Sequence, residues 1–74
     1  MDELELQEAW AAITEQVKTY PEIDASQINA FFPRLEIQAM SSDFAMLTAA
    51  TDFIKTWIER HYIDVIKRAF GELY

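Results

Sequence analysis

Apolar residues recur at helical spacing through the last third of the chain, from Thr51 to Phe70. With successive residues placed about 100° apart, one side of the helical wheel becomes a mainly apolar arc centred near Ile58. The arc contains Ile54, Trp57, Ile58, His61, Tyr62, Val65, Ile66 and Ala69. Glu59 and Arg60 lie opposite it or at its edge, so the pattern predicts one long amphipathic helix that the rest of the chain covers on one side. Gly71 is the expected end of this helix.

A second helical pattern occupies the start of the chain. Apolar residues spaced for one helix face predict an amphipathic helix over about residues 3–19, and they are Leu6, Trp10, Ile13, Val17 and Tyr20. Pro21 ends this helix, because the residue before a proline is pushed out of helical geometry. Asp24 followed by Gln27 resembles a capping box. A short second helix is therefore expected to begin at Asp24 and to end at Pro33.

After Pro33 the spacing of apolar residues changes from a helical period to an alternating one. The alternation predicts one strand over Leu35–Ala39 and a second over Phe44–Ala49. The turn between them is assigned to Ser41, Ser42 and Asp43. The sequence thus predicts a small α+β domain of order α-α-β-β-α, with a short antiparallel hairpin packed on the long C-terminal helix. Residues 1–74 are expected to form one domain, and residues 72–74 are the possible start of a linker.

The 74-residue chain has a formal net charge of −7, and most of the excess lies near its start. Residues 1–24 contain seven acids against Lys18 alone. Excess carboxylates repel phosphate backbones, so the composition disfavours nucleic acid as a partner. The chain has no cysteine and no run of about 18 apolar residues, which together favour a cytoplasmic protein without a membrane span.

The sequence shows little that could carry chemistry. His61 is the only histidine, and Asp64 on the next turn could complete half of a metal site or an acid–base pair. Neither residue has a further partner in the pattern, so we expect His61 to be a partly covered structural residue. One glycine cannot build a phosphate-binding loop. The chain is therefore not expected to be an enzyme, or to hold a cofactor or metal.

Two large apolar residues fall outside the covered arc of the last helix. Phe53 follows Thr51, the expected helix cap, and lies about 140° from the centre of the arc, with Ile63 equally far on the other flank. An ideal helix would expose both, and exposed apolar side chains favour a protein partner. The alternative for Phe53 is that it folds back onto the hairpin or the second helix.

The hairpin presents a similar alternative between two faces. Phe44 and Met46 share one face of the second strand, whereas Ala45, Leu47 and Ala49 share the other. One of these faces must lie outside. If the smaller residues face the core, Phe44 and Met46 add to an exposed apolar surface.

Several segments in order resemble the N-terminal domain (domain I) of the bacterial chromosomal replication initiator DnaA. They are Trp10, then Ile28–Phe31 with Pro33-Arg34-Leu35, then Ala45–Ile54, then Trp57-Ile58 and Tyr62. The family shows a first-helix tryptophan, an aromatic segment before a proline and leucine, a strand ending in Ala-Pro-Asn-x-Phe, and Trp-Ile/Val-x-x-x-Tyr. Here Ala50 and Thr51 replace the usual Pro-Asn, which keeps a helix cap but loses the stiff strand exit.

The resemblance implies a KH-like domain at the start of a longer initiator, whose ATPase and DNA-binding parts lie downstream. Such domains contact other initiator molecules, help load the replicative helicase and bind initiator regulators. By matching positions, Phe53 corresponds to the family's helicase- and regulator-binding phenylalanine. Gln27 replaces an acidic partner-binding residue of the second helix, a role that Glu22 or Asp24 could take, and Ile63 is a further candidate for the partner-binding surface.

The same resemblance assigns self-association to Trp10, with Leu6 one turn earlier on the same helix. The helical wheel instead places Trp10 close to the apolar centre of the first helix, which favours core packing. Two alternatives to the interaction module also remain. One is a free-standing acidic regulator or DNA mimic, favoured by the acidic start, and the other is a weak KH-like binder of single-stranded nucleic acid, which would need a basic and aromatic face.

Overall fold

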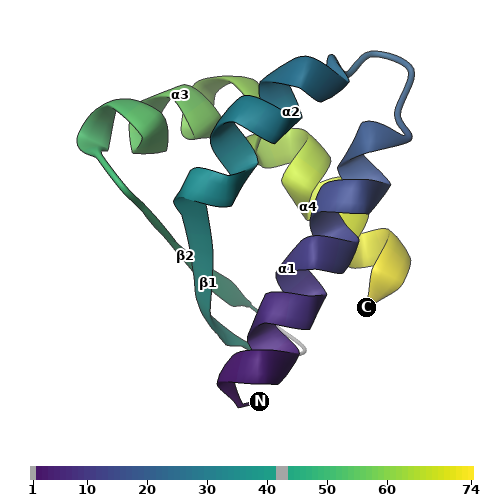
Figure 1. The fold of residues 1–74 in the computed structure, drawn as a ribbon. Coiled ribbons are helices and arrows are strands. Elements are labelled where there is room, and N and C mark those ends of the chain that lie inside the picture. Colours follow the sequence, from purple (N-terminus) through teal and green to yellow (C-terminus); the bar gives the residue numbers. More distant parts are fainter. Residues whose placement is uncertain (1, 42–43) are drawn as a thin grey trace.

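A computed structural model describes residues 2–41 and 44–74, which fold around one apolar core. Helix α1 spans Glu3–Lys18, helix α2 spans Ala25–Phe31, and a 3-10 turn follows over Phe32–Arg34. Strands β1 (Leu35–Met40) and β2 (Ala45–Ala49) form an antiparallel hairpin, and helices α3 (Asp52–His61) and α4 (Ile63–Leu73) complete the chain. The hairpin lies on one side and the helices cover its inner face (Figure 1).

The expected α+β class and the antiparallel hairpin are confirmed, but the prediction of one long last helix is wrong. Tyr62 leaves helical geometry, with φ −128° and ψ −4°, and separates α3 from α4. A straight helix over residues 52–73 would be about 33 Å long, whereas the longest extent of the whole domain is 29 Å. The break lets α3 pack on β2 while α4 packs on α1. The observed order is therefore α-α-β-β-α-α.

The ends of the helices follow from local chemistry. Asp2 caps α1 by accepting a hydrogen bond from the Glu5 backbone N–H, and Thr51 caps α3 by accepting one from that of Ile54. Asp24 caps α2, as its position predicts, but the reciprocal bond of a capping box from Gln27 is not formed among the described contacts. Gly71 does not end the last helix, because α4 continues to Leu73.

The hairpin turns its smaller residues toward the core. Ala45, Leu47 and Ala49 are half-buried, whereas Phe44 and Met46 are 56% and 54% exposed. In β1 an irregularity between Ile37 and Ala39 leaves Gln38 without a partner in the strand register. The irregularity lets Met40, opposite Ala45, turn to the inner face with the half-buried residues of β2. The strand β2 begins one residue later than predicted, and Ser42 and Asp43 of the predicted turn lie outside the described residues.

The core joins the apolar faces of all the elements. Its fully buried large side chains are Ile13, Val17, Ile28 and Phe32. No polar or charged side chain is buried among the described residues, so the fold depends on apolar packing. This core fixes α2 and α3 side by side at one end of the hairpin and α1 and α4 along it.

Candidate functional site

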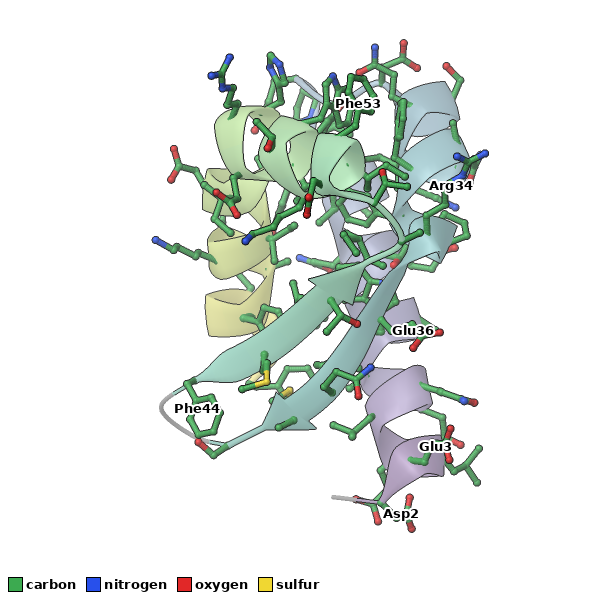
Figure 2. The ribbon with its side chains drawn as sticks, turned by 90° about the vertical axis from the view of Figure 1, so that its left-hand side faces the viewer. Asp2, Glu3, Arg34, Glu36, Phe44 and Phe53 are labelled. Carbon is green, nitrogen blue, oxygen red and sulfur yellow. The ribbon has the colours of Figure 1, made fainter. Side chains whose placement is uncertain are left out.

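The first turn of α3 carries the most exposed large apolar side chain described. Phe53 is 71% exposed, while its neighbour Ile54 is 2% exposed and anchors the helix in the core. Thr51 caps the same turn. The side chain of Phe53 projects from the end of the molecule where α2 and α3 meet (Figure 2). Phe53 therefore does not fold back into the core, and the solvent-exposed alternative is correct.

Aromatic side chains fasten α3 to α2 behind Phe53. The ring of Trp57 lies 4.2 Å from that of Phe31 and 4.8 Å from that of Tyr62, measured between centroids. His61 lies 5.2 Å from Trp57 but is exposed, so its expected partial burial is wrong. The break at Tyr62 puts His61 in the last turn of α3, at the surface. The aromatic contacts hold the α2–α3 surface in a fixed shape.

The start of α2 is fixed by two polar contacts. Tyr62 donates a hydrogen bond from its hydroxyl to the side chain of Gln27. Burial raises the pKa of Tyr62, and the negative charge of Asp24 raises it further. The hydroxyl and backbone N–H of Ser26 both donate to Asp24, and these bonds lower the pKa of Asp24. Gln27 in α2 and Asp24 at its N-cap thus lie exposed, and Gln27 contacts Tyr62 at the break between α3 and α4.

Glu22 contacts a different part of the molecule. Its carboxylate pairs with Arg68 of α4 at 3.3 Å, and the guanidinium of Arg68 lies 4.0 Å from the centre of the Tyr20 ring. Tyr20 donates a hydrogen bond from its hydroxyl to Glu72, and this bond lowers the pKa of Glu72. Burial is the main cause of the raised pKa of Tyr20. These contacts join the end of α1 to α4, so Glu22 is not free on the surface that carries Phe53.

Ile63 is half-buried, and the expectation that it is exposed opposite Phe53 is wrong. The helix break at Tyr62 turns the first residue of α4 toward the hairpin. Ile63 lines an apolar groove of about 880 Å³ between hairpin and α4, which we call the hairpin–α4 groove. Its other main walls are Leu47 and Phe44 of the hairpin, Phe70 of α4 and Tyr74, the residue after α4.

Trp10 and Leu6 are mostly covered, each with 8% of its surface exposed. The indole N–H of Trp10 donates to the backbone oxygen of Phe32 at 3.2 Å, and the two rings stack with centroids 5.3 Å apart. The exposed edges of Trp10 and Leu6 line a surface hollow of about 560 Å³ between α1 and β1, beside Gln7 and Glu36. Core packing of Trp10, favoured by its position on the helical wheel, is what the geometry shows.

The described residues offer little for chemistry. Within residues 2–41 and 44–74 there is no group of three or more His, Asp or Glu side chains that could hold a metal ion. No helix in that part of the chain is long and apolar enough to cross a membrane. What the surface presents instead is large apolar side chains, which are Leu4, Phe44, Met46, Phe53, Leu73 and Tyr74.

These features define a small α+β domain with exposed apolar groups on a rigid helical and hairpin frame. Residues 7–72 match the family described as the DnaA N-terminal domain. The chain belongs to this family, and it is an N-terminal module of the DnaA replication-initiator type, distinct from the ATPase part of such initiators. No curated protein and no solved structure matches the chain.

The hairpin–α4 groove was missed by the sequence analysis. The alternating strand pattern pointed to exposed Phe44 and Met46, but the position of α4 beside the hairpin depends on the helix break at Tyr62. Aromatic Tyr62 fits the apolar arc of a continuous helix, so nothing in the local pattern signalled the break. The one available signal was that residues 44–51 carry no charged side chain, which is uncommon for a strand at the edge of a sheet.

Proposed function

We propose that this domain is a protein-interaction module of a replication initiator, in which exposed Phe53 contacts the replicative helicase and initiator regulators. The observation that carries the proposal is the 71% exposure of Phe53 on a helix whose next residue is buried. A large apolar side chain held on a fixed frame can anchor a partner without losing much conformational entropy. The family membership supports a setting in the initiation of DNA replication, and the proposal places the module in the cytoplasm.

The proposed partner-binding surface extends from Phe53 in the first turn of α3 along that helix to the start of α2, which contacts Tyr62 after the last turn of α3. Gln27 and Asp24 lie there and are held by hydrogen bonds with Tyr62 and Ser26. Their polar groups would form the rim around the apolar anchor, as in many protein interfaces. Glu22 and Ile63 belong to the same predicted set but lie elsewhere. Glu22 pairs with Arg68 of α4, and Ile63 lines the hairpin–α4 groove, so any part they take in partner binding would be separate from that of Phe53.

The proposal includes weak association between initiator molecules through α1. Leu6 and Trp10 offer only the edges that line the hollow between α1 and β1. Exposed Gln7 in the same hollow gives a way to test the contact without disturbing the core. A Gln7→Arg domain should keep its stability within about 0.5 kcal/mol and lose concentration-dependent association in sedimentation velocity.

The central experiment compares Phe53→Ala with Phe44→Ala. Both side chains are exposed by more than half, so each change should alter the free energy of unfolding by about 0.5 kcal/mol or less. Binding of each variant to the purified helicase of the same organism would be measured by biosensor. We expect Phe53→Ala to weaken binding at least about tenfold, which equals about 1.4 kcal/mol, and Phe44→Ala to leave it unchanged.

Two results would count against the proposal. If Phe53→Ala lowered the free energy of unfolding by about 3 kcal/mol, Phe53 would be a core residue and its effect on binding would be indirect. If both variants bound the helicase as tightly as the original domain, the surface around Phe53 would not be the contact.

A further inference from the structure

Phe53 shares its face of α3 with one charged side chain, that of Arg60. With successive residues about 100° apart, Arg60 lies within about 20° of Phe53 around the helix axis. The rise of about 1.5 Å per residue places it about 10.5 Å further along the helix. Asp52 and Glu59, the acids of α3, lie about 100° or more from Phe53, and Lys55 lies about 160° away. This face therefore presents an exposed apolar group and, two turns later, a cation.

The positive charge of Arg60 is not neutralised by a neighbour in the domain. Arg60 is exposed and forms no ion pair within residues 2–41 and 44–74. Asp24, whose charge acts on Tyr62 at the end of α3, accepts two hydrogen bonds from Ser26 instead. An arginine in the last turn also interacts favourably with the helix dipole. Its charge alone does not define a contact, but its position in line with Phe53 does.

The most acidic segment of the domain lies away from this face. Asp2 and Glu3 mark the start of α1, at the opposite end of the molecule from Phe53, whereas Arg34 lies at the same end as Phe53 (Figure 2). Arg34 is exposed and likewise has no ion pair in the part of the chain that the structure describes. The potential around Phe53 is therefore more positive than the net charge of −7 suggests.

We propose that Arg60 selects the partner of the Phe53 surface, which is a protein with an apolar pocket for Phe53 and, about 10.5 Å away, a carboxylate for Arg60. This inference rests on the proposed function, because it specifies the partner of the same surface. A charge at the rim of an interface adds little affinity in water, but it pairs with a carboxylate and repels partners of like charge. Arg60 is thus a specificity-determining residue and Phe53 the apolar anchor.

A nucleic acid is the other class of partner that a free arginine could bind. Binding to a phosphate backbone takes several Lys or Arg side chains along the contact. The Phe53 face of α3 carries one cation in line with a large apolar side chain, and the domain as a whole is acidic. These features favour a protein carboxylate over a phosphate.

The test compares Arg60→Glu with Lys55→Glu in binding to the purified helicase of the same organism. Each change replaces a positive charge by a negative one, but Lys55 lies on the opposite side of α3 from Phe53. We expect Arg60→Glu to weaken binding at least about tenfold, because repulsion replaces attraction, and Lys55→Glu to weaken it less than about twofold. Thermal unfolding of both variants checks the fold, since a negative charge in the last turn opposes the helix dipole.

Two milder variants give measurements that a purely structural role of Arg60 would not change. Arg60→Gln should weaken binding about two- to fivefold at low salt, and its difference from the original domain should disappear in about 0.5 M sodium chloride. Arg60→Lys keeps the charge and should bind within about twofold of the original. Carbodiimide treatment of the complex with Arg60→Lys should join the new amine to an Asp or Glu of the helicase, a cross-link absent from the original domain.

The results separate this inference from the proposed function. If Phe53→Ala weakens binding while Arg60→Glu binds as tightly as the original domain, the Phe53 contact stands and only the role of Arg60 is overturned. If Phe53→Ala binds unchanged, both proposals fail. Equal weakening by Arg60→Glu and Lys55→Glu would reveal a general effect of net charge and overturn the specific contact. Saturable binding of a labelled single-stranded oligonucleotide that Arg60→Glu abolishes would assign Arg60 to nucleic acid, which also overturns the inference.

Discussion

Replacement of Trp10 separates its packing role from a surface role. Trp10→Phe keeps a ring stacked on Phe32 and removes the indole N–H that donates to the Phe32 oxygen. That oxygen retains a second donor, the backbone N–H of Leu35. The loss combines one hydrogen bond with a still-satisfied acceptor, about 0.5 to 1.5 kcal/mol, with the packing lost when the smaller ring replaces the buried indole. For a domain of this size, 1 kcal/mol lowers the melting temperature by about 4 to 8 °C.

Trp10→Ala is expected to be much more severe. Removing a buried aromatic ring costs about 3 to 5 kcal/mol, and a 74-residue domain has a total stability of about 4 to 11 kcal/mol at typical values per residue. The variant would then keep only a small free energy of unfolding at room temperature. Any loss of self-association in this variant would follow from the weakened fold.

Urea unfolding monitored by far-ultraviolet circular dichroism gives both free energies, with sedimentation velocity run on the same samples. The expected order of stability is original, then Trp10→Phe, then Trp10→Ala, with unchanged slopes against urea concentration. A Trp10→Ala domain that melted within about 2 °C of the original, yet no longer self-associated, would refute the core assignment. It would show that Trp10 acts at the surface.

Three further changes test local features of the fold. Thr51→Ala removes the side-chain acceptor for the Ile54 N–H and should cost about 1 kcal/mol in thermal unfolding, with Thr51→Asp as the control that keeps a cap. Gly71→Ala should raise stability by up to about 1 kcal/mol, because the added Cβ meets no atom and alanine favours the helix; a loss of stability would show that α4 needs glycine there. The hydrogen bond from Tyr20 is the main cause of the lowered pKa of Glu72 in the folded state. The stabilisation of the fold by ionised Glu72 is therefore fully present above the ordinary pKa of the carboxyl group and is lost as pH falls through the lower, folded-state pKa. Melting temperature should fall on acidification below about pH 4.5, its ordinary value, and Glu72→Gln should make that fall shallower; an unchanged slope would exclude Glu72 as a contributor.

Most of the local structure was predictable because it depends on short-range signals. The spacing of Leu6, Trp10 and Ile13 predicted α1, and Pro21 placed its end within about one or two residues. Alternation predicted both strands, and Thr51 was correctly expected to cap the helix that exposes Phe53. These features need only the periodicity of side chains and the chemistry of the neighbouring residues.

The amino-acid sequence by itself determined the α+β class, the apolar faces and the exposure of Phe53, because each follows from residues within a few turns of one another. Tertiary structure decided the break at Tyr62, the contact of its hydroxyl with Gln27 and the burial of Ile63. Each of these joins distant segments. A continuous helix would outrun the domain, so compact packing of α3 on the hairpin and α4 on α1 overrode the uninterrupted helical pattern. That long-range competition, absent from any local window of the sequence, created the hairpin–α4 groove.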